Sequence, residues 1–152
     1  MTTETVHNPI ANMRNKVHPK CVVCGFGNES GLHLEFDTAD NGSVTATFQC
    51  DEAFEGYPGR LHGGVISLIL DGAMCNCLFA RGRATVTAEM TTRFRYPVVT
   101  GQLASVSARI TRNSHHLYLL EAEIIQDGKV KATAKGKYYD QPKLAHAVER
   151  IS

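Results

Sequence analysis

Apolar and polar residues alternate along much of this chain. Apolar residues occupy every second position over 32–36 and again over 44–48, and the turn signal Asp40-Asn41-Gly42 lies between the two stretches. A period of two is typical of a strand with one buried face, and Asn-Gly turns join such strands. The pattern therefore predicts a β-hairpin over these residues.

One long stretch, residues 63–80, breaks the alternation. Its apolar side chains share no single face, so a helix here must be covered on all sides. Its 18 residues reach the lower limit for a membrane span, but Ser67, Asp71 and Asn76 lie inside it. We therefore expect a buried core helix that ends at Arg81-Gly82-Arg83, and no membrane association.

Four further strand-like stretches follow the helix. Asp127-Gly128 marks a second tight hairpin between the last two of them. The order strand, strand, helix and four strands in a meander predicts an α+β protein, in which an antiparallel sheet of about six strands wraps around one long central helix. The four stretches cover residues 84–96, 102–112, 116–126 and 130–140.

Length and charge limit the organisation and the partners. The 152 residues suffice for one domain, which we place at 20–141, between an N-terminal extension (1–19) and a C-terminal tail (142–152). The net charge is +1 and there is no basic block, which argues against nucleic acid as a partner. The N-terminus has no apolar run that could act as a secretory signal, so we expect a cytoplasmic protein.

Two features of the predicted helix carry candidate chemistry. Asp71 is the only charged residue in the apolar stretch, and burying an unpaired carboxylate is costly. It is either a hydrogen-bonded structural carboxylate or a nucleophile or general base in a cleft. Gly63 and Gly64 open the helix, where free N–H groups can bind an oxyanion; the alternative is that they only form a tight turn.

The spacing of these features predicts a shared site. Gly63 and Asp71 are about 12 Å apart along a helix, too far for both to act on one carbonyl carbon. If both act on the same bond, they come from different subunits. Two antiparallel helices would then form two sites per dimer.

At this point the chain resembles a known family. The segment His62-Gly63-Gly64, six residues and then Asp71, with Tyr57-Pro58-Gly59-Arg60-Leu61 before it and residues 85–98 after it, closely resembles the hotdog-fold acyl-CoA thioesterases of the phenylacetate-degradation type, within the 4-hydroxybenzoyl-CoA thioesterase superfamily. The resemblance covers residues 20–140 and implies the hotdog fold.

The resemblance also implies roles for the matched residues. The N–H of Gly63, helped by Gly64, would polarise the thioester carbonyl, and Asp71 of the partner subunit would attack it or activate a water. Thr87 matches a hydroxyl residue that orients this water. His62 matches a histidine that positions the loop; the alternative is that it only packs the turn.

Contacts with the substrate are less well determined. Many relatives carry Asn or Gln six or seven residues before the motif histidine, where this chain has Glu55 and Gly56. Either Glu55 substitutes for the amide or the site works without it. Phosphates of CoA need basic partners, and the candidates on strands or strand ends are Arg93, Arg95, Arg112, Lys135 and Lys137.

The odd number of cysteines, five, indicates reduced thiols and not a disulfide framework. Cys21 and Cys24 have the spacing of a zinc knuckle, which His18 or His33 would have to complete, because no second such pair exists. Relatives carry the same Cys-x-x-Cys-Gly lead-in before their first strand, which favours a structural role. We therefore expect no metal and no cofactor.

Together these features predict an acyl-CoA thioesterase that hydrolyses acyl-CoA to free acid and CoA as a homodimer or a dimer of dimers. A non-catalytic acyl-CoA-binding or regulatory hotdog protein is the main alternative, since fold does not fix function. A zinc-binding interaction module built on the cysteine pair is a further one.

Overall fold

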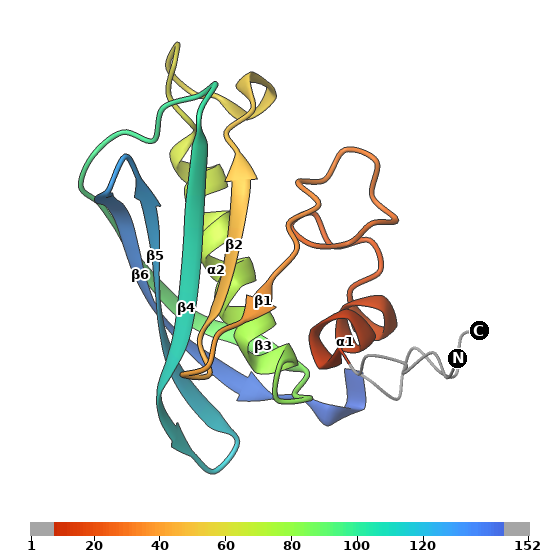
Figure 1. Cartoon of the computed structure of the whole chain (residues 1–152). Helices are drawn as coiled ribbons and strands as arrows, with labels where there is room; N and C mark the ends of the chain where they lie inside the picture. Colours follow the sequence, from red (N-terminus) through yellow and green to blue (C-terminus); the bar gives the residue numbers. More distant parts are fainter. Residues whose placement is uncertain (1–7, 145–152) are drawn as a thin grey trace.

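An antiparallel sheet curves around one long helix in the computed structural model, which describes residues 8–144 (Figure 1). The helices are α1 (Pro9–Val17), the 3-10 helix η1 (Glu52–Phe54) and α2 (Gly63–Phe79). The strands are β1 (Asp37–Thr38), β2 (Val44–Gln49), β3 (Thr85–Phe94), β4 (Leu103–Ser114), β5 (Leu117–Gln126) and β6 (Lys129–Asp140). This is the hotdog fold that the resemblance implied.

The strands lie in the order β1-β2-β4-β5-β6-β3, and every neighbouring pair is antiparallel. Asp127 and Gly128 join β5 to β6 with positive φ angles of 53° and 72°. This is the backbone of a two-residue hairpin turn, so the predicted turn is confirmed. The predicted central helix and the last three strands are also confirmed.

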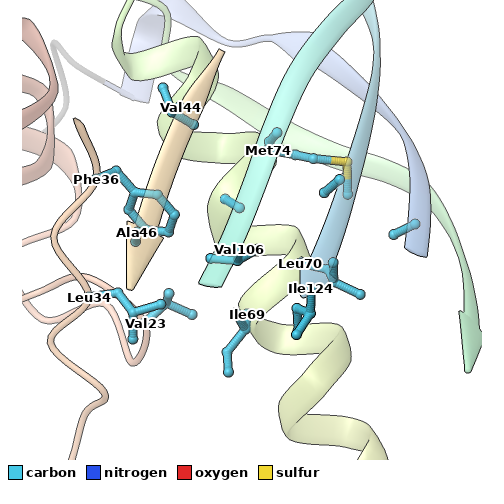
Figure 2. Packing of buried hydrophobic residues seen from close by; sticks show 14 of the residues in the cluster. Val23, Leu34, Phe36, Val44, Ala46, Ile69, Leu70, Met74, Val106 and Ile124 are labelled. Atoms are coloured by element: carbon cyan, nitrogen blue, oxygen red, sulfur yellow. The ribbon is translucent and has the colours of Figure 1, made fainter. Parts of the chain in front are cut away.

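The helix α2 is buried because different parts of the chain cover it from different sides. Its residues Ile69, Leu70 and Met74 belong to the same core as Val106 of β4 and Ile124 of β5 (Figure 2). The segment before β1 covers another side. This explains why the helix is apolar all round.

Close packing between this segment and α2 depends on a glycine. A Cβ at Gly72 would lie 2.5 Å from Cγ1 of Val23, closer than real Cβ contacts come. The position next to Asp71 is therefore small because the N-terminal segment packs directly on the helix backbone.

Two details of the predicted sheet are wrong. Residues 32–36 do not form a strand, because the N–H groups of Leu32 and Leu34 donate to the carbonyls of Val22 and Val23 and not to β2. Their alternation reflects burial alone. The four last strands are not one meander either, because β3 pairs with β6 at the far edge of the sheet.

The helix α1 lies in the predicted N-terminal extension and was not expected. Asn8 caps it by accepting a hydrogen bond from the Ala11 N–H (3.1 Å), and Pro9 occupies the first turn. Its Ile10 is buried in the main core. Most of the predicted C-terminal tail, residues 145–152, lies outside the described residues.

Across residues 8–144, no helix combines the length and the apolar character that crossing a membrane requires.

Candidate active site

The carboxylate of Asp71 lies two turns inside α2 and is half-buried. Its Oδ1 accepts two hydrogen bonds, one from the hydroxyl of Thr87 (2.8 Å) and one from the phenol of Tyr138 (2.7 Å). Thr87 on β3 and Tyr138 on β6 are directly paired in the sheet, so the two donors reach the carboxylate together. The sheet thus holds one oxygen of Asp71 in a fixed position.

Tyr138 is a site residue that sequence reasoning missed. It lies in an alternating strand where a buried aromatic residue is expected for packing alone, and nothing in the pattern signals its hydroxyl. It is fully buried, and burial together with the charge of Asp71 raises the pKa of its phenol. Tyr138 therefore stays protonated and acts as a donor to Asp71.

Space for the tyrosine ring comes from Gly136, two residues earlier on the same face of β6. A Cβ at Gly136 would lie 2.6 Å from Cε2 of Tyr138 and 3.1 Å from Sδ of Met74. The absence of a side chain at Gly136 leaves room for the Tyr138 ring, whose hydroxyl reaches Asp71.

The arrangement suits a carboxylate with one oxygen available for reaction. Both recorded donors bind Oδ1, and in the part of the chain that the structure describes no donor reaches Oδ2. The Thr87 hydroxyl proton points to Asp71, so Thr87 can offer a water only its lone pairs. Such a carboxylate can attack a carbonyl carbon or accept a proton from a water.

The first turn of α2 supplies a free backbone donor. His62 is the N-cap residue, and its Nδ1 accepts the N–H of Gly64 at 2.8 Å. No acceptor for the N–H of Gly63 occurs among residues 8–144. Of the two glycines, Gly63 is thus the one whose N–H is available for an oxyanion.

His62 itself is exposed and fixed by the loop before it. Its N–H donates to the carbonyl of Phe54 (3.0 Å), and a Cβ at Gly56 would lie 3.2 Å from Cδ2 of its ring. The absence of a side chain at Gly56 therefore makes room for the His62 ring.

A pocket of about 600 Å³ opens at this end of the helix. Its lining includes His62, Gly63, Phe94 and Arg95, but not Asp71. Within one chain, the free N–H of Gly63 therefore lies at the pocket, whereas the carboxylate of Asp71 lies outside it.

A buried glutamine fixes one wall of this pocket. The side chain of Gln126, at the end of β5, accepts from the N–H of Val99 (2.8 Å) and donates to its carbonyl (2.9 Å). The adjoining Val98 carbonyl accepts the N–H of Leu61 at 2.8 Å. These bonds join the loop after β3 to the loop before α2.

The structure separates the remaining candidates. Arg95 lines both the pocket beside Gly63 and a groove on the face of the sheet away from α2. That groove is also lined by Arg93, Lys135 and Lys137. Arg112 is exposed on β4 and lies outside the pocket lining. Glu55 is exposed, and its Oε2 accepts the N–H of Gly59 (3.1 Å), so it stabilises its own loop.

The cysteines fall into two groups. Cys50, Cys75 and Cys77 are buried, as expected, and burial raises the pKa of each thiol, that of Cys50 to about 11. Cys21 and Cys24 lie close together, and the hydrogen bond from Cys24 lowers the pKa of the Cys21 thiol. His18 joins this pair; His33 does not, because its ring binds the carbonyl of Asn28.

Comparisons with known proteins agree with this fold. Residues 58–133, half of the chain, match the model of the thioesterase superfamily. An acyl-coenzyme A thioesterase of Bos taurus, THEM4, is 29% identical over 89 residues, covering 57% of this chain and 36% of the relative. The chain thus spans about a third of the length of that protein.

Solved structures show the same architecture. A thioesterase superfamily protein has a TM-score of 0.76 at 25% identity, over 83% of this chain and 67% of its own. A phenylacetic acid degradation-related protein of Ralstonia eutropha has a TM-score of 0.70 at 24% identity, over 87% and 99%. A Streptococcus pneumoniae protein solved with coenzyme A has a TM-score of 0.67 at 16% identity, over 71% and 88%. The chain belongs to the thioesterase superfamily.

Proposed function

We propose that this protein hydrolyses an acyl-CoA thioester to the free acid and CoA. The observation that carries the proposal is the Asp71 carboxylate, held at one oxygen by Thr87 and Tyr138 with its other oxygen open. Membership of the thioesterase superfamily and the likeness to a bovine acyl-CoA thioesterase support the substrate class.

The reaction needs a polarised carbonyl and an attacking oxygen. The Gly63 N–H, at the positive end of α2, would donate to the carbonyl oxygen and stabilise the charge that develops there. Asp71 would either attack the carbon, forming an anhydride that water hydrolyses, or take a proton from an attacking water. In both routes the C–S bond breaks, and the CoA thiolate gains a proton.

We propose that each site is shared by two chains. In one chain the pocket beside Gly63 excludes Asp71, and the helix separates them by about 12 Å. A second chain with its α2 antiparallel would bring its Asp71 to this pocket. The free edge of the sheet supports such pairing, because β3 and the residues after it leave apolar side chains exposed, at Val86, Phe94 and Tyr96.

Arg95 is our candidate for a phosphate of CoA, because it lines the pocket beside the proposed oxyanion donor. Arg93 and Arg112 are secondary candidates, which a partner chain could bring closer. Solved relatives of this fold bind CoA or acetyl-CoA. We also place the protein in the cytoplasm, because its five cysteines are thiols, which suits a reducing compartment.

The test is release of free thiol from a panel of acyl-CoAs with short, long and aromatic acyl groups. We expect turnover of at least one class, and Asp71→Asn should reduce kcat at least about a hundredfold while the melting curve stays that of a folded protein. The asparagine keeps the shape of the side chain and removes the base. Saturable acyl-CoA binding without thiol release would favour a binding or regulatory protein, and near-normal turnover in the folded variant would exclude Asp71 from the mechanism.

A further inference from the structure

Three metal-ligating side chains meet on the side of the molecule where α1 ends. His18 follows the last residue of α1, and Cys21 and Cys24 lie in the turn after it. One ligand atom from each lies within 4.8 Å of the other two. Ligand atoms around a tetrahedral zinc ion lie roughly 3.5 Å apart, so small side-chain rotations would close the set.

The turn is built to surround the Cys21 sulfur. The N–H of Val23 donates to Sγ of Cys21 (3.4 Å), and the N–H of Gly25 donates to the Cys21 carbonyl (2.9 Å). A side chain at Gly25 would collide with the backbone of Cys21 and His18, so only glycine permits this turn. An N–H directed at sulfur stabilises the negative charge of a metal-bound thiolate.

Two buried polar atoms beside the cysteines lack partners. Nδ1 of His18 and Oδ1 of Asn76 are both buried without a hydrogen bond in residues 8–144. Asn76 is 1% exposed, and its amide contacts the Cys24 thiol. Unsatisfied buried polar groups are costly, so two of them at one cluster favour a ligand that would bind there.

We propose that His18, Cys21 and Cys24 bind one zinc ion, with a water in the fourth position that donates to Oδ1 of Asn76. Two thiolates and one imidazole form a donor set typical of zinc. Their charge balances that of Zn²⁺, so the complex can lie against the apolar helix α2 at low electrostatic cost. The rings of Phe79 and His18 pack at right angles, with 4.9 Å between their centroids, and this contact restricts the orientation of the imidazole.

The site would stabilise the N-terminal segment against α2. Cys21 and Cys24 flank Val23, which packs on Gly72 directly beside Asp71. Zinc would thus lock the segment that covers the helix behind the candidate active site. This role is independent of the proposed hydrolysis.

The experiment uses the full chain, purified with reductant, treated with chelator and then given zinc or cobalt alone. We expect one zinc per chain, a thiolate-to-cobalt charge-transfer band with Co²⁺, and a rise in Tm of about 5 °C at saturating zinc. Cys21→Ser/Cys24→Ser should lose all three. Cys50→Ala should keep them, because Cys50 is buried elsewhere and its Sγ accepts only from Gln126 among the described residues.

A readout on the unmodified protein covers the case in which the double variant fails to fold. Zinc should protect Cys21 and Cys24 from alkylation, mapped by mass spectrometry, and leave the labelling of Cys50 unchanged. Any of three results would overturn the proposal. The protein could bind less than one zinc per chain, the reduced preparation could contain a Cys21–Cys24 disulfide, or the double variant could still bind zinc.

Discussion

At the scale of single residues, the two donors to Asp71 are not equivalent. Thr87 is exposed in the single chain, whereas Tyr138 is buried beneath it. In the proposed mechanism the reacting charge resides on Asp71, so a hydroxyl that orients this carboxylate should contribute less than the carboxylate itself.

Thr87→Ala should therefore reduce kcat less than Asp71→Asn does, by about tenfold, the effect of one lost charged hydrogen bond. Thr87→Ser, which keeps the hydroxyl, should retain most of the activity. Steady-state thiol release measures both. A serine variant as inactive as Asp71→Asn would contradict the orienting role.

The buried phenol of Tyr138 should make the stability of the protein depend on pH. Its pKa in the folded chain lies above the value near 10 of an unfolded tyrosine. Above about pH 10 the folded state keeps a proton that the unfolded state loses. The contribution of Tyr138 to the free energy of unfolding is therefore complete below about pH 10. Above that pH the free energy of unfolding falls by up to about 1.4 kcal/mol per pH unit.

Urea unfolding of the wild type and Tyr138→Phe between pH 8 and 11 isolates this contribution, because the buried cysteines affect both proteins equally. The difference between the two free energies should shrink as the pH rises. A constant difference would show that Tyr138 does not titrate on unfolding.

At the scale of elements, α2 carries both parts of the candidate site, while loops at its first turn shape the pocket. The side chain of Gln126 binds Val99, the neighbour of the pocket-lining Val98, through both of its polar atoms. The helix sets the distance between Gly63 and Asp71, and the hydrogen bonds of Gln126 to Val99 hold the loop that forms one side of the pocket.

Gln126→Leu should lower the free energy of unfolding by about 2 kcal/mol, because it leaves the N–H and carbonyl of Val99 without partners. Where thiol release is measurable, KM should rise more than kcat falls. Gln102→Leu is the matched control, since Gln102 is an exposed residue at the other end of the same loop. If the two variants were equally stable, the proposed role of the Gln126 hydrogen bonds would be contradicted.

At the scale of the whole molecule, the proposed shared site predicts that two inactive variants complement each other. Asp71→Asn removes the carboxylate. Gly63→Pro removes the donor N–H at a position where the first helical turn accepts proline, and the extended ψ of His62 (136°) suits a residue before proline.

Each variant alone should be nearly inactive. In a mixed dimer one site contains both defects and the other contains neither, so an equal mixture refolded together should recover about a quarter of the wild-type activity by random pairing. Size-exclusion chromatography must first show that Gly63→Pro dimerises. No recovery from proven heterodimers would exclude the shared site.

The sequence by itself determined much of the local structure, although it missed α1 and predicted 32–36 as a strand. Period-two alternation and the turn residues Asp127-Gly128 indicated the strands and the hairpin at the end of the chain through contacts between near neighbours. The apolar stretch at 63–80 marked the central helix, and its lone charge marked Asp71 for the same local reason.

Only the tertiary structure decided which distant segments meet. The sequence pattern shows that 85–94 is a strand but not that it pairs with β6, because strand pairing is a long-range choice. It shows that 32–36 is half-buried but not that Val22 and Val23 accept its N–H groups. The hydrogen bond from the phenol of Tyr138 to Asp71 arises in the same way, from packing between parts of the chain that periodicity does not connect.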